Sequence, residues 1–150
     1  MNFVQLQRAS LVSLAECEAV GRLSAPPGEP LRFLNPEGLP TSPNYSQVAL
    51  VAAPRLVLTG TQLAFGQREE DVRLAFQRMD KTLDSFRARF SGVAMSRIYP
   101  LSAAVAEKIR AARFDFFNKA SPPASTMLTF EDLPSLDASF AIDVTAVAER

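Results

Sequence analysis

The chain contains no histidine, no tryptophan and a single cysteine, Cys17, among its 150 residues. Without histidine there is no Ser–His–Asp triad, no imidazole base that titrates near neutral pH and no histidine-based zinc or iron site. A single cysteine excludes a disulfide within the chain. Any catalysis therefore depends on carboxylates, tyrosine, lysine, arginine, hydroxyl groups, backbone amides or ordered water, and we expect neither a metal nor another cofactor.

The chain also lacks an excess of charge of either sign, because 16 basic residues balance 16 acidic ones. A protein held mainly by phosphate contacts usually carries a basic excess, so nucleic acid is a disfavoured partner. No apolar run approaches the roughly 20 residues of a membrane span, and no leader of the signal-peptide type is visible. We therefore expect a cytoplasmic protein with Cys17 reduced and with no membrane partner.

The length and a hydrophobic content of 47% are typical of one globular domain. Residues 2–7 alternate like a short strand, and residues 10–23 fit either a strand or a short helix. The proline-rich residues 24–30 predict a turn or linker. Residues 35–46, rich in Pro, Gly, Asn and Ser, form either a functional loop or only a long connection.

The middle of the chain predicts a hairpin followed by a long helix. Apolar runs at 47–52 and 55–65 flank Ala53-Pro54 and suit a β-hairpin, in which Gly60 indicates a bulge or a close approach of the backbone to another group. Acidic residues then precede an apolar stripe with helical spacing, and Gly92 supplies a stop. The stripe is expected in the core and consists of Val72, Phe76, Met79, Leu83, Phe86 and Phe90.

The remaining elements predict an α+β two-layer sandwich. A buried strand at 93–101 precedes a helix that Ser102 caps and that ends near Asn118, with a stripe of Val105, Ile109, Ala112 and Phe116. Strands at 125–130 and 138–147 follow, and the second of these alternates apolar and polar positions. Two helices cover only one face of such a sheet, so the other, partly apolar face suits a homo-oligomer.

The stretch SPPASTMLTF, Ser121 to Phe130, places two hydroxyl side chains at the start of a strand that otherwise belongs to the core. Two explanations remain open from the residues alone. The prolines and hydroxyls form a turn that only begins the strand, or they form the floor of a ligand pocket.

Several segments in one order resemble the RidA/YjgF family, also called L-PSP endoribonuclease-like. They are NYSQV, LVLTGTQ, RIYPL, FDFFNKASPPAST and LPSLDASFAIDVTAV, and they span about residues 36–147. The resemblance implies a chorismate mutase-like α+β fold in residues 36–150, with residues 1–35 as an N-terminal extension. It also implies a homotrimer with three small-molecule pockets between subunits, and an enamine/imine deaminase activity that releases ammonia from compounds such as 2-iminopropanoate.

The resemblance also implies where the pocket residues lie and which of them have changed. The family's carboxylate-binding arginine, whose planar fork lysine cannot copy, is replaced by Ser125, and its water-orienting glutamate by Ala141. Asp143 matches a second acidic position and Tyr45 an early tyrosine. The other positions that the family pattern assigns to the pocket are Thr59, Gly60, Thr61, Thr126 and Met127.

Arg110 is a candidate replacement for the missing arginine, since it matches a pocket asparagine of the family's second helix. The alternative is an ordinary solvated helix arginine. Asp143 is interpreted either as a base or water anchor, or as a polar contact between subunits. Tyr45 and Thr59 are interpreted as hydrogen-bonding residues of the pocket.

Two functions remain open, and a third is disfavoured. The first is an enzyme with a rebuilt pocket, a divergent deaminase or hydrolase that acts on a small metabolite by acid–base chemistry. The second is a non-catalytic trimer that binds a metabolite or a protein. The balanced charge and the absence of histidine argue against endoribonuclease activity.

Overall fold

The computed structural model describes residues 18–133 and 135–149. The expected strand at 2–7 and most of the segment 10–23 lie outside these residues, and residues 18–23 form neither helix nor strand. The elements, in chain order, are β1 (Leu31–Leu34), β2 (Val48–Val51), β3 (Leu56–Leu58), β4 (Gln62–Phe65), α1 (Glu69–Ser85), β5 (Ala88–Pro100), α2 (Ala103–Ala112), the 3₁₀ helix η1 (Arg113–Asp115), β6 (Ala124–Met127) and β7 (Ala138–Ala148).

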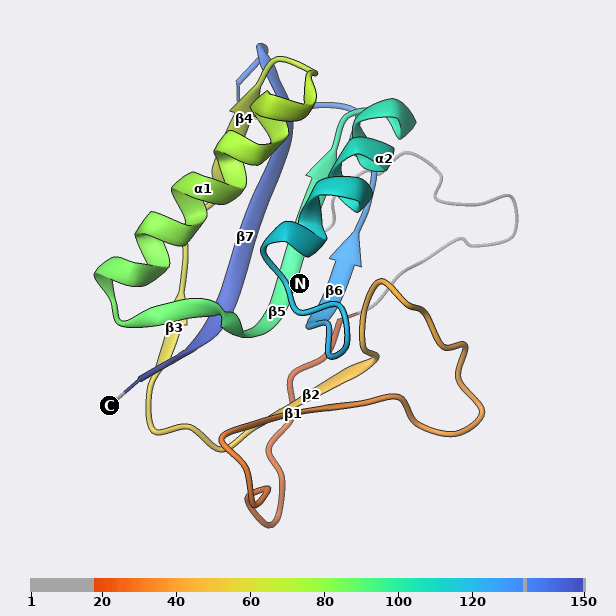
Figure 1. The fold of residues 1–150 in the computed structure, drawn as a ribbon. Coiled ribbons are helices and arrows are strands. Elements are labelled where there is room, and N and C mark those ends of the chain that lie inside the picture. Colours follow the sequence, from red (N-terminus) through yellow and green to blue (C-terminus); the bar gives the residue numbers. More distant parts are fainter. Residues whose placement is uncertain (1–17, 134, 150) are drawn as a thin grey trace.

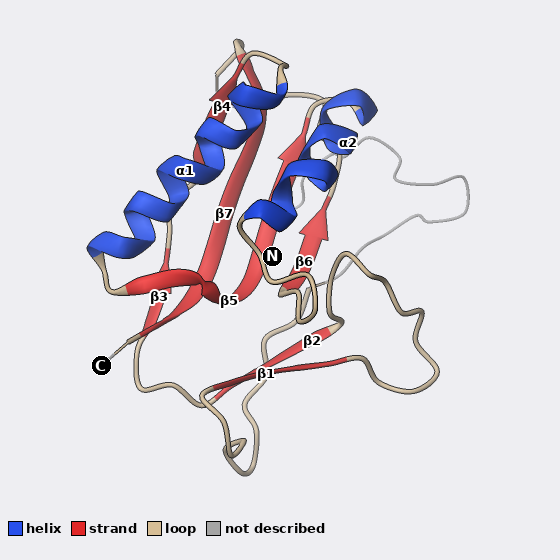
Figure 2. Ribbon diagram, in the orientation of Figure 1, coloured by secondary structure: helices blue, strands red, loops and turns tan. Residues whose placement is uncertain are grey.

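The main sheet has the order β3-β7-β5-β6, and β4 also pairs with β7. The β5–β6 pair is parallel, whereas β7 is antiparallel to β3, β4 and β5, so the sheet is mixed. Both helices lie on one face of this sheet (Figures 1 and 2). The predicted α+β arrangement, a mixed sheet with two helices on one side, is confirmed. In the described part of the chain, no helix is both long enough and apolar enough to cross a membrane.

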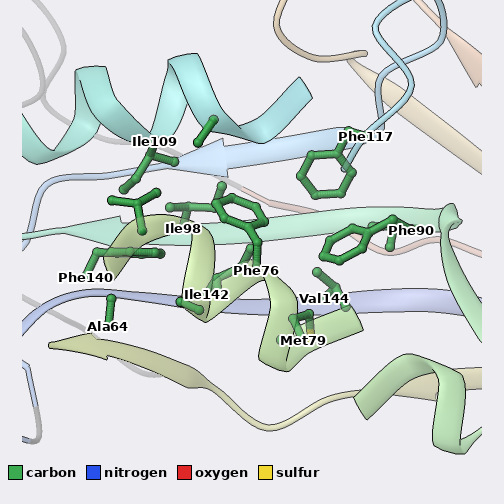
Figure 3. Packing of buried hydrophobic residues seen from close by; sticks show 14 of the residues in the cluster. Ala64, Phe76, Met79, Phe90, Ile98, Ile109, Phe117, Phe140, Ile142 and Val144 are labelled. Atoms are coloured by element: carbon green, nitrogen blue, oxygen red, sulfur yellow. The ribbon is translucent and has the colours of Figure 1, made fainter. Parts of the chain in front are cut away.

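The core lies between the helices and the sheet. Alternate residues of β7 point to the helices, as the sequence predicted, and Phe140, Ile142, Val144 and Ala146 are at most 1% exposed. They pack with side chains of α1 such as Phe76 and Met79, and with Ile98 and Ile109 (Figure 3). One face of β7 and β5, the two central strands of the sheet, is thus buried under the helices.

The predicted hairpin between residues 47–52 and 55–65 is wrong. Strand β2 pairs with β1 instead, with Leu34 opposite Val48, and this two-stranded ladder lies apart from the main sheet (Figure 1). The second run is divided at residues 59–61 into β3 and β4, which both pair with β7. Pro54 provides no backbone donor between β2 and β3, which explains why the chain leaves the first ladder there.

The long helix ends earlier than its apolar stripe suggested. Helix α1 ends at Ser85, Phe86 is 61% exposed, and Phe90 is buried as a residue of β5 rather than of the helix. Gly92 is not the stop; the chain turns at Arg87, whose φ is 56°. Similarly, α2 ends at Ala112 and continues as η1 rather than reaching Asn118, while Ser102 caps it as expected by accepting from the Val105 amide at 3.2 Å.

The start of α1 depends on a glycine. Asp71 Oδ2 accepts from the Arg68 amide at 3.0 Å, and this bond lowers the pKa of the Asp71 carboxyl. A Cβ on Gly66, which has a φ of +90°, would lie 2.5 Å from Asp71 Oδ2. Gly66 is therefore required both by its backbone conformation and by the space that the Asp71 carboxylate takes.

We predict that Arg87→Gly stabilises the protein by about 0.5–1 kcal/mol, because the left-handed conformation at the end of α1 is strained for any residue with a Cβ. Arg87→Ala, which keeps the Cβ, is the matched control and should leave stability nearly unchanged. Urea unfolding of the three proteins measures the difference. Equal midpoints for the glycine and alanine variants would show that no strain is stored at this residue.

Candidate functional site

Ser125 lies on β6, at one edge of the main sheet. Its hydroxyl accepts a hydrogen bond of 2.8 Å from the Ser96 hydroxyl, which is fully buried on β5. Met127, two residues further along β6, packs against the core under the helices, so Ser125 shares that face of the strand. Thr126 points to the opposite, open face and is the register partner of Arg97.

The loop that contains Tyr45 is attached to the start of β6. Ser46 donates from its amide to the Pro123 carbonyl at 3.0 Å and from its hydroxyl to the Pro122 carbonyl at 2.7 Å. Ser46 also forms an isolated parallel bridge with Ala124. Tyr45 and Ser125, 80 positions apart in the sequence, are thus brought to the same edge of the sheet.

Thr59, Gly60 and Thr61 lie at the opposite edge, where the chain passes from β3 to β4. The Thr59 amide donates to the Val144 carbonyl, and the Thr59 hydroxyl accepts from the Val144 amide, both at 3.0 Å. Gly60 and Thr61 are exposed, and a Cβ on Gly60 would meet no atom within 4 Å. No described contact within one chain therefore requires glycine at position 60.

The structure therefore divides the predicted site residues between two edges. Strands β7 and β5 separate β3 and β4 from β6. Three strand spacings of about 4.8 Å place the two edges roughly 14 Å apart within one chain. Ser125, Thr126, Met127 and Tyr45 gather at one edge, and Thr59, Gly60 and Thr61 at the other.

Asp143 lies between these edges, on the open face of the sheet. Its Oδ1 accepts from Arg97 Nη1 at 3.1 Å, and Arg97 Nε donates to Glu18 Oε2 at 2.8 Å. Burial raises the pKa of the Asp143 carboxyl, against the opposing effect of Arg97. Burial also acts to lower the pKa of Arg97, but its bonds to Glu18 and Asp143 outweigh this and raise it. Sequence reasoning missed Arg97, whose signal is a cation within the apolar run VAMSRIYPL.

Arg110 lies on the exposed side of α2, where its side chain is 45% exposed and forms an ion pair with Glu107. The neighbouring Arg113 differs sharply, because it is only 2% exposed. Arg113 is not among the residues predicted for the site. Its position next to the apolar stripe of α2 is the signal that could have identified it.

A cavity of about 490 Å³ lies elsewhere, between the β1–β2 ladder and the ends of β5 and β7. The predicted site residues do not line it. Its lining is mostly apolar, including Leu31, Ala52 and Val147, with the Arg89–Glu149 ion pair at 3.5 Å beside it. These side chains offer little for acid–base chemistry, so we do not place the candidate site there.

Comparison with solved structures identifies the architecture. A protein of unknown function of the conserved Rid family, YyfB from Yersinia pestis, is 22% identical and superposes with a TM-score of 0.71, covering 79% of this chain and 99% of its own. The chain has the Rid/YjgF fold. A YjgF family member from Neisseria meningitidis, NMB1025, matches with 16% identity and a TM-score of 0.58 over 80% of this chain and 96% of its own.

A member of the YjgF/YER057c/UK114 family from Mycobacterium tuberculosis shows the same Rid/YjgF fold, with 18% identity and a TM-score of 0.56 over 79% of this chain and 99% of its own. No protein-family model matches the sequence, and no curated protein matches it either. The likeness to these solved structures therefore lies in the fold.

We predict that Ser125→Ala costs about 1–2 kcal/mol of stability, because it leaves the buried Ser96 hydroxyl without its described partner. Ser96→Ala combined with Ser125→Ala should recover part of this loss, since both polar groups are then removed. A double-mutant cycle from urea unfolding measures the coupling. Additive effects of the two changes would contradict a Ser96–Ser125 hydrogen bond.

Tyr99 gives a prediction at high pH. Its ring packs on Phe130 with centroids 4.7 Å apart, and burial, reinforced by the Asp143 charge, raises its pKa to about 12 from the usual 10. A raised pKa means that the stability contributed by the neutral phenol is complete below pH 10 and is lost as the pH rises towards 12. Stability of the wild type should therefore fall more steeply over this interval than that of Tyr99→Phe.

Chemical denaturation from pH 9 to pH 12, with phenolate absorbance as a second readout, measures this effect. The folded wild type should show a late-ionising tyrosine that is absent from Tyr99→Phe. Identical stability profiles for the two proteins would contradict a buried neutral phenol at position 99.

Proposed function

We propose that the chain is a divergent member of the Rid/YjgF family, a homotrimer that binds a small metabolite in pockets between subunits. The main support for this proposal is that the candidate residues form two separate groups. Within one chain the two groups lie at opposite edges of the sheet, roughly 14 Å apart. They form a single pocket if the β6 edge of one copy faces the β3–β4 edge of the next.

Exposed apolar side chains support such an interface. Leu56 is 47%, Leu58 74% and Phe65 48% exposed along the β3–β4 edge. An unpaired sheet edge with apolar side chains is an aggregation hazard unless another surface covers it. A second copy of the chain would cover this edge and would place Gly60, with its free space, against the partner.

The chemistry that we propose for this pocket is hydrolytic or acid–base. Tyr45, Thr59, Thr61 and Ser125 are the candidates to supply hydroxyl groups that orient a ligand or a water, whereas Thr126 points to the open face of the sheet, on which Asp143 lies. Asp143, whose pKa is raised, is the candidate base or water anchor. Ser125 in place of an arginine removes the bidentate grip on a substrate carboxylate, so the standard deaminase reaction should be slow.

The Arg97–Asp143 ion pair favours a second candidate function. Arg97 Nη1 lies 3.1 Å from Asp143 Oδ1 and opposes the rise in pKa that burial causes, and Asp143 also lies away from both edges. A trimer that binds its metabolite without turnover would keep this ion pair as a structural contact. Asp143→Asn separates the two functions. If the protein is an enzyme, this change should abolish turnover; if the protein only binds its metabolite, the change should leave binding intact.

The test is ammonia release from freshly generated 2-iminopropanoate. We predict that the wild type is slow and that Ser125→Arg is at least about tenfold faster, because a bidentate arginine contact is worth more than one charged hydrogen bond. Ser125→Lys is the matched control, since it adds the charge without the fork and should give less activity than Ser125→Arg.

Light scattering on the same proteins measures their assembly, and a mass three times that of the 16.4 kDa chain is expected. Thermal unfolding confirms that each variant folds. A wild type as active as an arginine-bearing relative would refute our interpretation of Ser125. A monomer would refute the intersubunit pocket.

A further inference from the structure

Arg113 is the largest fully buried side chain in the described part of the protein. It opens η1 directly after α2 and is 2% exposed. Burial and the neighbouring positive charge of Arg110 lower its pKa to about 10, so it remains a cation at neutral pH. A buried cation is unfavourable unless an anion or several acceptors compensate for its lost hydration.

Two nitrogens of the Arg113 guanidinium have neither an anion nor a hydrogen-bond acceptor beside them among the described residues. Arg113 Nε and Nη2 are both buried and have no hydrogen-bond partner among residues 18–133 and 135–149. No ion pair joins Arg113 to a carboxylate in that part of the chain. The nearby charge that acts on it, Arg110, is positive and makes the deficit larger.

Aromatic rings account for part of the environment of Arg113. Its guanidinium carbon lies 5.5 Å from the Phe114 ring centroid and 5.4 Å from that of Phe117. Phe117 in turn packs edge-on against Phe90 at 5.0 Å, within the core (Figure 3). Such rings attract a cation through their faces but accept no hydrogen bonds from the edge of a guanidinium in the way that oxygen atoms do.

The two unpartnered nitrogens share one edge of the guanidinium plane. Along this edge a carboxylate accepts two parallel hydrogen bonds, one on each oxygen. We propose that Arg113 is a binding residue for the carboxylate of a small ligand, with Nε and Nη2 as the donors. Both nitrogens are shielded, so entry requires a movement of the covering side chains.

The other candidate cations are already paired. Arg97 binds Asp143 and Glu18, and Arg110 binds Glu107 on the surface of α2. The Arg113 proposal deepens the proposed function, because it names the class of ligand, a small carboxylate. It rests on the proposed function for the premise that the protein binds a metabolite. The observation that carries it, however, lies within one chain and does not require a trimer.

The experiment compares the wild type with Arg113→Met and Arg113→Lys, and with Arg78→Met as a matched removal of an exposed arginine. The probes are acetate, propionate and butanoate at constant ionic strength, with the corresponding amides as neutral controls. Thermal unfolding and calorimetry should show carboxylate binding to the wild type and to Arg78→Met, and no response to the amides. Affinity should fall at least about tenfold in Arg113→Met, because two charge-assisted bonds are lost.

Arg113→Lys keeps the charge but lacks the fork, so it should fold and still bind the carboxylates more weakly than the wild type. Without ligand, Arg113→Met should unfold at the same temperature as the wild type or higher, because an uncompensated buried charge has been removed. Equal carboxylate responses in the wild type and in both Arg113 variants would overturn the proposal. Strong destabilisation of ligand-free Arg113→Met would also overturn it, since the chain itself would then supply the counter-ion.

A carboxylate from a second copy of the chain would give a different result. The stability of the wild type would then rise with protein concentration in an Arg113-dependent way, with no response to added carboxylates, and the small-ligand proposal would be wrong. A different result would show that the proposed function is wrong while the Arg113 proposal is right. A monomer that still binds acetate through Arg113 would refute the intersubunit pocket and leave this inference standing.

Discussion

Antiparallel pairing of β5 with β7 is the interaction on which the rest of the structure depends. These strands have 13 and 11 residues, and every other strand of the main sheet is attached to one of them. Their register places Ile98 opposite Ile142 on the face that the helices cover, and Arg97 opposite Asp143 on the open face. One pairing therefore fixes both the hydrophobic core and the ion pair of the candidate site.

The same pairing separates the two groups of candidate residues. Because β5 and β7 occupy the centre of the sheet, Ser125 on β6 and Gly60 beside β3 lie at opposite edges, and a rigid packed sheet cannot bring them together. A function that uses both groups requires a second copy of the chain. A function that uses Arg113 does not, since that residue directly follows α2 and is buried within one chain. The two proposals thus depend on different physical features of one fold.

Periodic patterns in the sequence predicted what depends on local burial. The stripe from Val72 to Leu83 and the alternation in β7 are repeated on one face of one element, so each is visible without the fold. The end of α1 was not predictable in this way, because Phe86 and Phe90 continue the helical spacing while Arg87 turns the chain. The pairing of β2 with β1 joins segments that are separate in the sequence, and no local pattern specifies it.

The most direct test of the central claim, that the two sheet edges meet between copies, is a cross-linking experiment with mixed variants. One variant carries Thr61→Cys and the other Ser125→Cys, both in a Cys17→Ser background, and a short bifunctional maleimide is added to each alone and to the re-assembled mixture. The account predicts a cross-linked pair of chains that forms mainly in the mixture. Absence of that product from the mixture, with both variants folded and labelled, would contradict it.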